Sequence, residues 1–261
     1  DPVCMAENDN DLSTCADFWE TRTYANPNLK PERSRQLSAG IVFQPHKQLS
    51  LGVDYWNISK RDLISTIGDD VILGNLAKYE QLVHRYNEDE GLAGCDYDDT
   101  DSAICFIELQ KENRGRMKFA GLDFTIDARG LKSPVGTFGA KLVGTLTLTS
   151  KRQFGNGDPY VSNLGRFVTD GVVQRWRHRI TFDWAQGPYS LSLANQFLSG
   201  YTDQNSAIDT DSGTVVQPNK VKAYSLWDVA GAWDVTKQFT VRGGIKNLLN
   251  TAPPFSNQAT F

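Results

Sequence analysis

The chain has 261 residues, of which 39% are hydrophobic, and a formal net charge of −4. This length and apolar content exclude a disordered chain, and no apolar run approaches the about 18 residues that a membrane-spanning helix needs. The acidic balance, with a sequence pI near 5.4, excludes the basic surface expected of a nucleic-acid-binding protein. A mean hydropathy of −0.43 remains compatible with membrane β-strands, because their alternating apolar and polar residues average out.

The start of the chain and its cysteines indicate where the protein works. The chain begins with Asp1 and has no signal segment, so we expect a mature chain or a piece of one. By spacing, Cys4 pairs with Cys15 and Cys95 with Cys105, which favours two local disulfides in an oxidising compartment over free thiols. A zinc site is disfavoured because the Cys-x-x-Cys spacing is absent and the histidines are scattered. We expect no metal and no cofactor.

Apolar and polar residues alternate in eight segments of the chain. In the clearest segment Leu122 and Phe124 have one parity, and Asp123 and Thr125 have the other. This period of two predicts β-strands, and no segment has the helical period over a helical length. The predicted strands cover residues 34–43, 48–59, 118–129, 137–150, 175–185, 189–200, 223–235 and 238–246.

The connections between these strands alternate in length. Short turns follow the first, third, fifth and seventh strands, and long polar loops follow the others at 60–116, 151–174 and 201–222. Outer-membrane barrels have short periplasmic turns and long extracellular loops. The sequence therefore predicts an all-β fold, a transmembrane antiparallel up-and-down β-barrel. Aromatic residues near the strand ends fit an interfacial girdle: Tyr55, Trp56, Trp184, Tyr189, Trp227, Trp233 and Phe239.

No motif of a known catalytic site is present. The Gly-x-Ser-x-Gly, P-loop and His-Glu-x-x-His patterns are all missing, so we expect no enzyme activity. Residues 209–213 resemble part of a calcium loop but lack the expected glycine and glutamate at later positions. The acidic residues between 88 and 101 would hold cations or repel anions. For both segments we favour a solvated loop.

Four motifs resemble those of TonB-dependent outer-membrane receptors. Residues 24–34 resemble an "NP-x-L-KPE-x-S" signature that precedes a strand late in the barrel, and residues 51–58 are similar to the next strand. Asn113-x-Gly115 with Gly121-Leu122-Asp123 resembles an "N-x-G … G-x-E/D" strand start, and residues 244–257 resemble a "G-V-x-N-L-F-D … PP" segment. The residues that match the first and last motifs are Asn26, Pro27, Leu29, Lys30, Pro31, Glu32, Asn247, Leu248, Pro253 and Pro254. The motifs occur in the family's order.

The resemblance implies a fragment with about eight strands of a family-typical barrel of about 22 strands. Residues 1–32 would form an extracellular loop, 33–247 the strands and long loops, and 248–261 the start of the last extracellular loop. The final strand and the plug domain would lie outside this chain. The alternative is a self-closed eight-stranded barrel with a structural or adhesion role.

The family resemblance also implies a function and partners. We expect a component of an active-transport receptor, multi-pass in the outer membrane of a Gram-negative bacterium. Its partners would be outer-membrane lipid, the remainder of the receptor with its plug, and a TonB-type energy-coupling protein. The substrate would be a small molecule, metal chelate such as an iron–siderophore, saccharide or peptide, bound in part by the long loops; haem is slightly disfavoured because the loops show no haem-ligating histidine motif.

Three arginines form the most notable polar group. Period two places Arg175, Arg177 and Arg179 on the polar face of one predicted strand. They would contact an anionic substrate or the plug, or they would form ion pairs inside the barrel. The partners for such ion pairs are Asp123, Asp127 and Asp183, and we favour this second interpretation.

Overall fold

The computed structural model describes residues 20–85, 104–155, 157–168, 171–203 and 220–256. The chain forms two compact units, and each is considered by itself. The smaller unit comprises residues 1–33 and 61–115, and the larger comprises residues 34–60 and 116–261. Among the described residues, none of the helices has both the length and the apolar character needed to cross a membrane.

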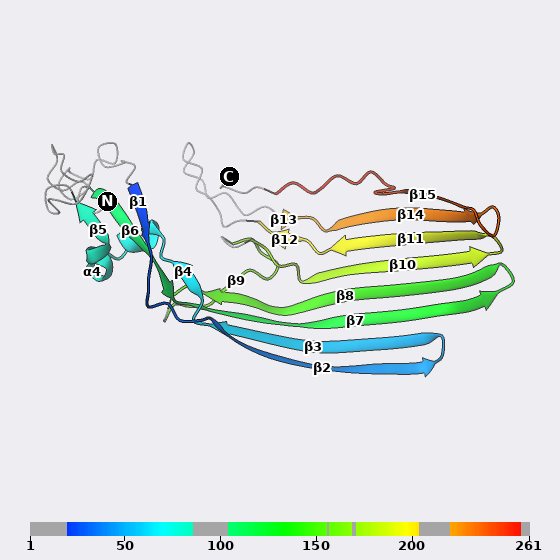
Figure 1. Cartoon of the computed structure of the whole chain (residues 1–261), viewed down its shortest axis with the longest axis horizontal. Helices are drawn as coiled ribbons and strands as arrows, with labels where there is room; N and C mark the ends of the chain where they lie inside the picture. Colours follow the sequence, from blue (N-terminus) through cyan, green and yellow to red (C-terminus); the bar gives the residue numbers. More distant parts are fainter. Residues whose placement is uncertain (1–19, 86–103, 156, 169–170, 204–219, 257–261) are drawn as a thin grey trace. The chain divides into compact units, whose positions relative to one another are not determined.

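The larger unit is built on a nine-stranded sheet (Figure 1). Its main path runs β15-β14-β11-β10-β8-β7-β3-β2, and the short β9 pairs with β8. The strands are β2 (Arg33–His46), β3 (Leu49–Arg61), β7 (Arg116–Ser133), β8 (Gly136–Gln153), β9 (Val161–Ser162), β10 (Trp176–Gln186), β11 (Tyr189–Leu198), β14 (Tyr224–Asp234) and β15 (Thr240–Ile245). β12 (Tyr201–Thr202) and β13 (Lys220–Val221) form a separate pair. The eight long strands confirm the eight predicted segments.

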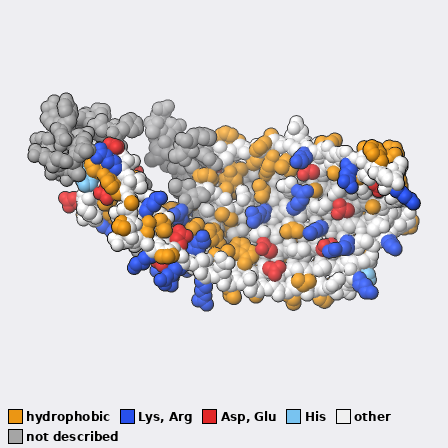
Figure 2. Space-filling model, viewed as in Figure 1, with side chains coloured by type: hydrophobic (Ala, Val, Ile, Leu, Met, Phe, Trp, Pro, Cys, Tyr) orange, Lys and Arg blue, Asp and Glu red, His pale blue; other side chains and the backbone are white. Residues whose placement is uncertain are grey.

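The pairing register divides the side chains of this sheet between two faces. Residues directly opposite each other on neighbouring strands share a face. Leu146 lies opposite both Leu122 and Trp176, whereas the adjacent Thr145 lies opposite Asp123 and Arg177. We call these sides the apolar face and the polar face. Figure 2 shows charged side chains of both signs scattered over the sheet among small and polar residues.

The apolar face is not covered by a second layer within the described residues. Phe182 is 44% exposed, Leu191 47% and Trp233 46%, although all three belong to rows of apolar side chains. A soluble sandwich would bury such rows against another sheet. Exposed apolar rows of this kind are typical of strands that face lipid.

One irregularity changes the alternation near the ends of β7 and β8. Ala120 pairs with Thr149 but Gly121 pairs with Thr147, so Leu148 is an extra residue in β8. Such a bulge leaves one residue unpaired and shifts every later residue of its strand to the opposite face. Beyond it Lys118 lies opposite Lys151.

Glycines allow two tryptophan rings to lie flat on the sheet. A Cβ atom at Gly144 would lie 2.6 Å from the Trp176 ring, and one at Gly121 would lie 2.4 Å from the Trp56 ring. Gly121 has the same parity as Asp123, so Trp56 lies on the polar face. The expected place of Trp56 in an outer aromatic girdle is therefore wrong, because its strand parity sets it over Gly121 instead.

The sheet is open in the described part of the chain. β2 and β15 are the two ends of the strand order and do not pair with each other. On β2, Ile41 is 70% exposed and Phe43 59%. The structure therefore does not show the self-closed eight-stranded barrel that was the alternative, and its edge amides need other partners.

The smaller unit is folded, although the sequence predicts a long loop at 60–116. Its elements are β1 (Glu20–Tyr24), β4 (Ile64–Thr66), α3 (Asp69–Leu73), α4 (Leu76–Tyr79), the 3-10 helix η1 (Glu80–Leu82), β5 (Val83–Arg85) and β6 (Ile104–Asn113). A small core of Ile67, Ile72, Tyr79 and Ile107 holds them together. Ile72 and Ile107 are both 0% exposed. These apolar residues are too widely spaced in the sequence to form a periodic pattern.

β6 is the central strand of this unit. β1 pairs with it in parallel, and β4 and β5 pair with it antiparallel. The Arg22 guanidinium lies 4.0 Å from the centre of the Phe106 ring and donates to a Glu20 carboxylate oxygen at 3.0 Å. This hydrogen bond lowers the pKa of the Glu20 carboxyl. β1 is thus fixed to β6 by a ring contact in addition to its backbone pairing.

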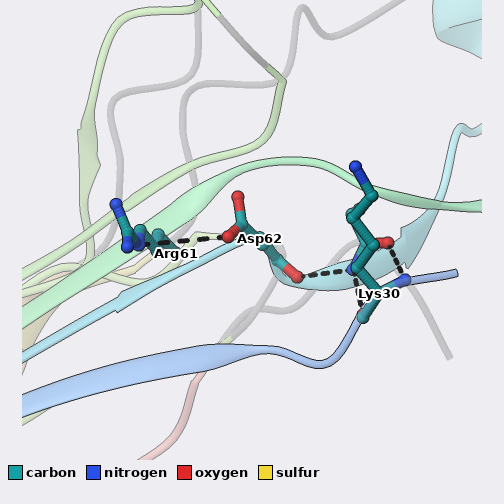
Figure 3. Close-up of polar contacts among 4 residues, drawn as sticks. Lys30, Arg61 and Asp62 are labelled. Carbon is teal, nitrogen blue, oxygen red and sulfur yellow. Dashed lines mark hydrogen bonds and ion pairs between the residues drawn. The ribbon is translucent and has the colours of Figure 1, made fainter.

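The motif at residues 26–32 crosses the start of this unit, and Asn113 at the end of β6 binds it. Its Nδ2 donates to the carbonyl oxygens of Lys30 at 2.6 Å and Asp62 at 2.9 Å. Its Oδ1 accepts from the Lys30 backbone N–H at 2.6 Å. Figure 3 shows Lys30 and Asp62 at this junction, with Arg61 paired to the Asp62 carboxylate at 3.9 Å. One asparagine side chain therefore joins three segments.

The other motif residues shape the turn and the link to β2. Asn26 Nδ2 donates to the Lys111 carbonyl at 2.8 Å, and Pro27 occupies the turn that follows. Leu29 is half-buried, Pro31 lies in the non-repetitive link before β2, and Glu32 Oε1 accepts from the Ile64 backbone N–H at 3.0 Å. In this structure the motif therefore has a structural role.

Replacing Ile107 tests the core of the smaller unit. We expect Ile107→Ala to lower the opening free energy of β6 by about 2–5 kcal/mol, because a fully buried side chain is lost. Hydrogen exchange of the β6 amides in the intact receptor measures this. The control is Val71→Ala, at a side chain 45% exposed, which should change the value by less than about 0.5 kcal/mol. Equal effects of the two changes would contradict the core assignment.

Replacing Asn113 tests the junction. Asn113→Ala removes three hydrogen bonds, so we expect local opening of residues 24–33 to become easier by about 1–3 kcal/mol. Limited proteolysis of the intact receptor should then cleave this stretch roughly tenfold faster. Asn28→Ala is the matched control, because within the described residues Asn28 forms a hydrogen bond only through its backbone N–H. A cleavage rate that stays at the level of this control would refute the role of Asn113.

Candidate functional site

Two of the three predicted arginines lie side by side on the polar face. β10 begins at Trp176, between β8 and β11. Arg177 is opposite Thr145 and Leu198, and Arg179 is opposite Val143 and Gln196. Both side chains are exposed. Their spacing of two residues puts both guanidinium groups on the same face of one strand, as predicted.

Arg175 precedes the strand. Its backbone carbonyl accepts a hydrogen bond from the Thr147 N–H at 2.9 Å, and its side chain is exposed. Because β10 begins one residue later than the predicted strand did, the alternation of the strand does not fix the direction of this side chain. Only its position in the sequence therefore supports Arg175 as a substrate-binding residue.

A hollow of about 400 Å³ lies over the two strand arginines. Polar side chains from four neighbouring strands line it: Arg177, His178 and Arg179 of β10, Thr145 of β8, Gln196 of β11 and Tyr224 of β14. Sequence reasoning missed Gln196 and Tyr224. Finding them requires the register between strands. Gln196 lies opposite Arg179 because β10 pairs with β11, and the spacing in the sequence alone does not reveal this.

The predicted acidic partners are engaged elsewhere. Asp123 accepts a hydrogen bond from Thr145 Oγ1 at 2.8 Å. The two oxygens of Asp127 accept from Arg129 Nε at 3.0 Å and Nη2 at 2.5 Å. Asp183 lines a different hollow, with Arg129 and Arg242.

Because these carboxylates are engaged elsewhere, they do not neutralise the two arginines of the hollow. Within the described ranges, no ion pair involves Arg177 or Arg179. The favoured lumen ion pairs of these two arginines are therefore not formed by the described residues. Their guanidinium groups leave planar, bidentate donors available to an anionic ligand.

A polar cluster follows β15 at the last of the four family motifs. Asn247 has φ 50°, in the left-handed region that asparagine tolerates better than most residues. Its backbone N–H donates to Asp228 Oδ1 at 2.9 Å, and its side-chain Oδ1 accepts from the Thr251 N–H at 2.8 Å. The Leu248 N–H donates to the Trp227 carbonyl at 2.6 Å. These bonds fasten the segment that leads to Pro253 and Pro254 against β14.

Some of the predicted sites include residues outside the described part of the chain. Cys105 in β6 is 5% exposed and disulfide-bonded, whereas Cys4, Cys15 and Cys95 lie outside the described residues. The pairing of the cysteines therefore stays a prediction. The acidic residues of 88–101 and the stretch 209–213 also fall outside. In the ranges that are described, no group of three or more His, Cys, Asp or Glu residues is arranged to hold a metal ion.

Comparison with known proteins agrees with this architecture. A family model described as "TonB dependent receptor-like, beta-barrel" matches residues 13–248. A mutant of the ferric enterobactin receptor PfeA from Pseudomonas aeruginosa, in complex with enterobactin, is similar with a TM-score of 0.56 and 16% identity over 91% of this chain and 29% of that chain.

Two further solved structures are similar. The FrpB iron transporter from Neisseria meningitidis (F3-3 variant) has a TM-score of 0.53 and 14% identity, covering 89% of this chain and 29% of that chain. The outer membrane transporter YddB from Escherichia coli has a TM-score of 0.56 and 13% identity, covering 90% and 31%. At these identities the likeness shows the fold, and the chain spans less than a third of each of these proteins. The family match over residues 13–248 shows that the chain belongs to the TonB-dependent receptors and forms part of their β-barrel domain.

Proposed function

We propose that this chain is part of the wall of an outer-membrane receptor that imports its substrate with a TonB-type energy-coupling protein. The family match carries this proposal. The apolar face would lie in the outer-membrane lipid, since its rows of exposed apolar residues have no second layer within the described residues. The polar face would line the lumen. Import rather than enzymatic turnover is the expected activity.

The open edges support an arrangement with further strands. In lipid, every backbone N–H and C=O needs a partner, so an open sheet edge is not stable there. β2 and β15 would pair with other strands of the same receptor. The plug domain would occupy the lumen beside the polar face, and the long loops after β3, β8 and β11 would contribute to substrate binding.

The hollow over Arg177 and Arg179 supports an anionic substrate. Two guanidinium groups, the Gln196 amide and the Tyr224 hydroxyl group offer hydrogen-bond donors in one place. We propose an anionic metal chelate as the substrate class. The similar solved structures whose names mention ferric enterobactin or iron are consistent with this class. Outer-loop binding of a neutral saccharide or peptide would not require these arginines.

The test uses the intact receptor in its own bacterium. We expect deletion of the gene to abolish uptake of one radiolabelled iron chelate from a panel of anionic and neutral chelates, and the wild-type gene to restore it. The combined change Arg177→Gln and Arg179→Gln should weaken binding of that chelate at least tenfold. Removing one charge-assisted hydrogen bond costs about 1.5–3 kcal/mol, and about 1.4 kcal/mol is tenfold in Kd.

Two controls separate charge from assembly. Arg177→Lys with Arg179→Lys keeps the charges but loses the planar donors, so its affinity should lie between that of the wild type and that of the glutamine pair. Lys132→Gln with Arg242→Gln removes two charges outside the hollow and should bind as the wild type does. Heat-modifiable gel mobility reports barrel folding in every variant. If the glutamine pair binds and imports normally, the arginines do not belong to the site; if deletion affects no uptake, the transport proposal fails.

A further inference from the structure

We propose that a cationic hollow on the apolar side of the larger sheet binds the phosphate group of a membrane lipid headgroup. This inference rests on the proposed function, because it requires the apolar face to lie in the outer membrane. The hollow has a volume of about 550 Å³ and lies at the long-loop ends of β2, β3, β7 and β8. Its polar side chains include Arg35, Asn57, Ser59, Lys118 and Lys151.

The pairing and packing of the strands place these residues on the apolar side. Lys118 has the same parity on β7 as Leu122, and the bulge at Leu148 brings Lys151 to the same side, opposite Lys118. On β3 the Trp56 ring lies against Gly121 on the polar face, so its neighbour Asn57 points to the opposite side.

The same reasoning applies to β2. A Cβ atom at Gly40 would collide with the Asp54 carboxylate, and Asp54 shares the parity of Trp56 on β3. Gly40 therefore faces the polar side, and Arg35 and Leu37, which have the other parity, face the apolar side. Three strands, β2, β7 and β8, thus bring three cations together on one surface, and β3 adds two polar side chains.

The described residues do not balance the charges of the hollow. Like charges directly opposite each other on neighbouring strands repel, as Lys118 and Lys151 do. The Tyr160 ring partly offsets this, since its centre lies 5.0 Å from Lys118 Nζ and 5.1 Å from Lys151 Nζ. No Asp or Glu lines the hollow, and among the described residues no ion pair involves these lysines or Arg35. A phosphate group would supply the missing negative charge.

Its position on the strand favours a lipid over a soluble phosphate. On β7 the apolar row continues from Ala120 to Ala128, and Lys118 comes directly after it. Lys118 and Ala128 are ten residues apart, which corresponds to about 33 Å along a strand and to about 25 Å across the membrane at a strand tilt of about 40°. An outward apolar band of about 25 Å is typical of outer-membrane barrels. The cations would therefore lie at the headgroup level.

An apolar side chain next to the cations completes the match to a lipid. Leu37 lines the hollow two residues from Arg35 and is 62% exposed, and Ile41 on the same side of β2 is 70% exposed. An acyl chain that leaves the phosphate toward the membrane interior would run along these side chains. A soluble phosphate would make no use of them.

The experiment measures lipid binding by the full-length receptor purified from outer membranes. The probes are bisphosphorylated lipid A, the same lipid after removal of its phosphates, and inorganic phosphate. We expect the wild type to bind the phosphorylated lipid in preference to the dephosphorylated one. Arg35→Gln, Lys118→Gln and Lys151→Gln together should weaken this binding at least tenfold, and excess inorganic phosphate should not displace the lipid.

Matched variants keep the test interpretable. Lys118→Arg with Lys151→Arg preserves the charges and should bind as the wild type does. Lys132→Gln, Lys141→Gln and Arg242→Gln remove three charges outside the hollow and should stay within twofold of the wild type. Equal binding by the triple glutamine variant would overturn the proposal, and displacement by inorganic phosphate would assign the site to a soluble anion instead.

Fractionation and uptake measured on the same cells separate this inference from the proposed function. Absence of the receptor from the outer-membrane fraction would overturn both. A receptor that resides in that fraction and imports its substrate, but does not distinguish the two lipids, would overturn the lipid site alone.

Discussion

The hydrogen-bonded register between neighbouring strands is the constraint on which the larger unit depends. It makes Thr145 lie opposite both Asp123 and Arg177, and thereby assigns whole rows of side chains to one face. The arginine hollow is a product of this register, since its lining comes from four strands that are separate in sequence. No single strand contains the site. A slip of one residue in any of the four would move its contribution to the other side.

The same sheet is incomplete as a folded object in water. Its apolar face has exposed rows in place of a packed core, and its edge strands β2 and β15 have no partner beyond them in the described residues. Hydrogen bonding and the hydrophobic effect both remain unsatisfied at its borders. By contrast, the smaller unit has its own buried core around Ile72 and Ile107. The two units therefore depend on different environments.

Much of the sheet could be predicted from the sequence, because strict alternation determines both the strand and its faces. The positions of Arg177 and Arg179 follow from parity alone. The interactions of Asp127 do not, since its partner Arg129 is two residues away on the same strand rather than across the sheet. The smaller unit was missed because Ile67, Ile72, Tyr79 and Ile107 have no common period. Trp56 was misplaced because aromatic character was weighed above the parity of its strand.

The bulge at Leu148 acts as a parity switch within β8. Before it, residues with odd numbers such as Lys141 lie on the polar face, and beyond it odd-numbered Lys151 lies on the apolar side. If the unchanged sequence of β8 paired with β7 regularly, without the bulge, Lys151 would lie on the polar face and Ser150 on the apolar face. Insertion or loss of a residue is tolerated in most surface loops. In β8 the accommodation of one extra residue as a bulge decides the face on which Lys151 lies, so the pairing of this strand carries as much information as its composition.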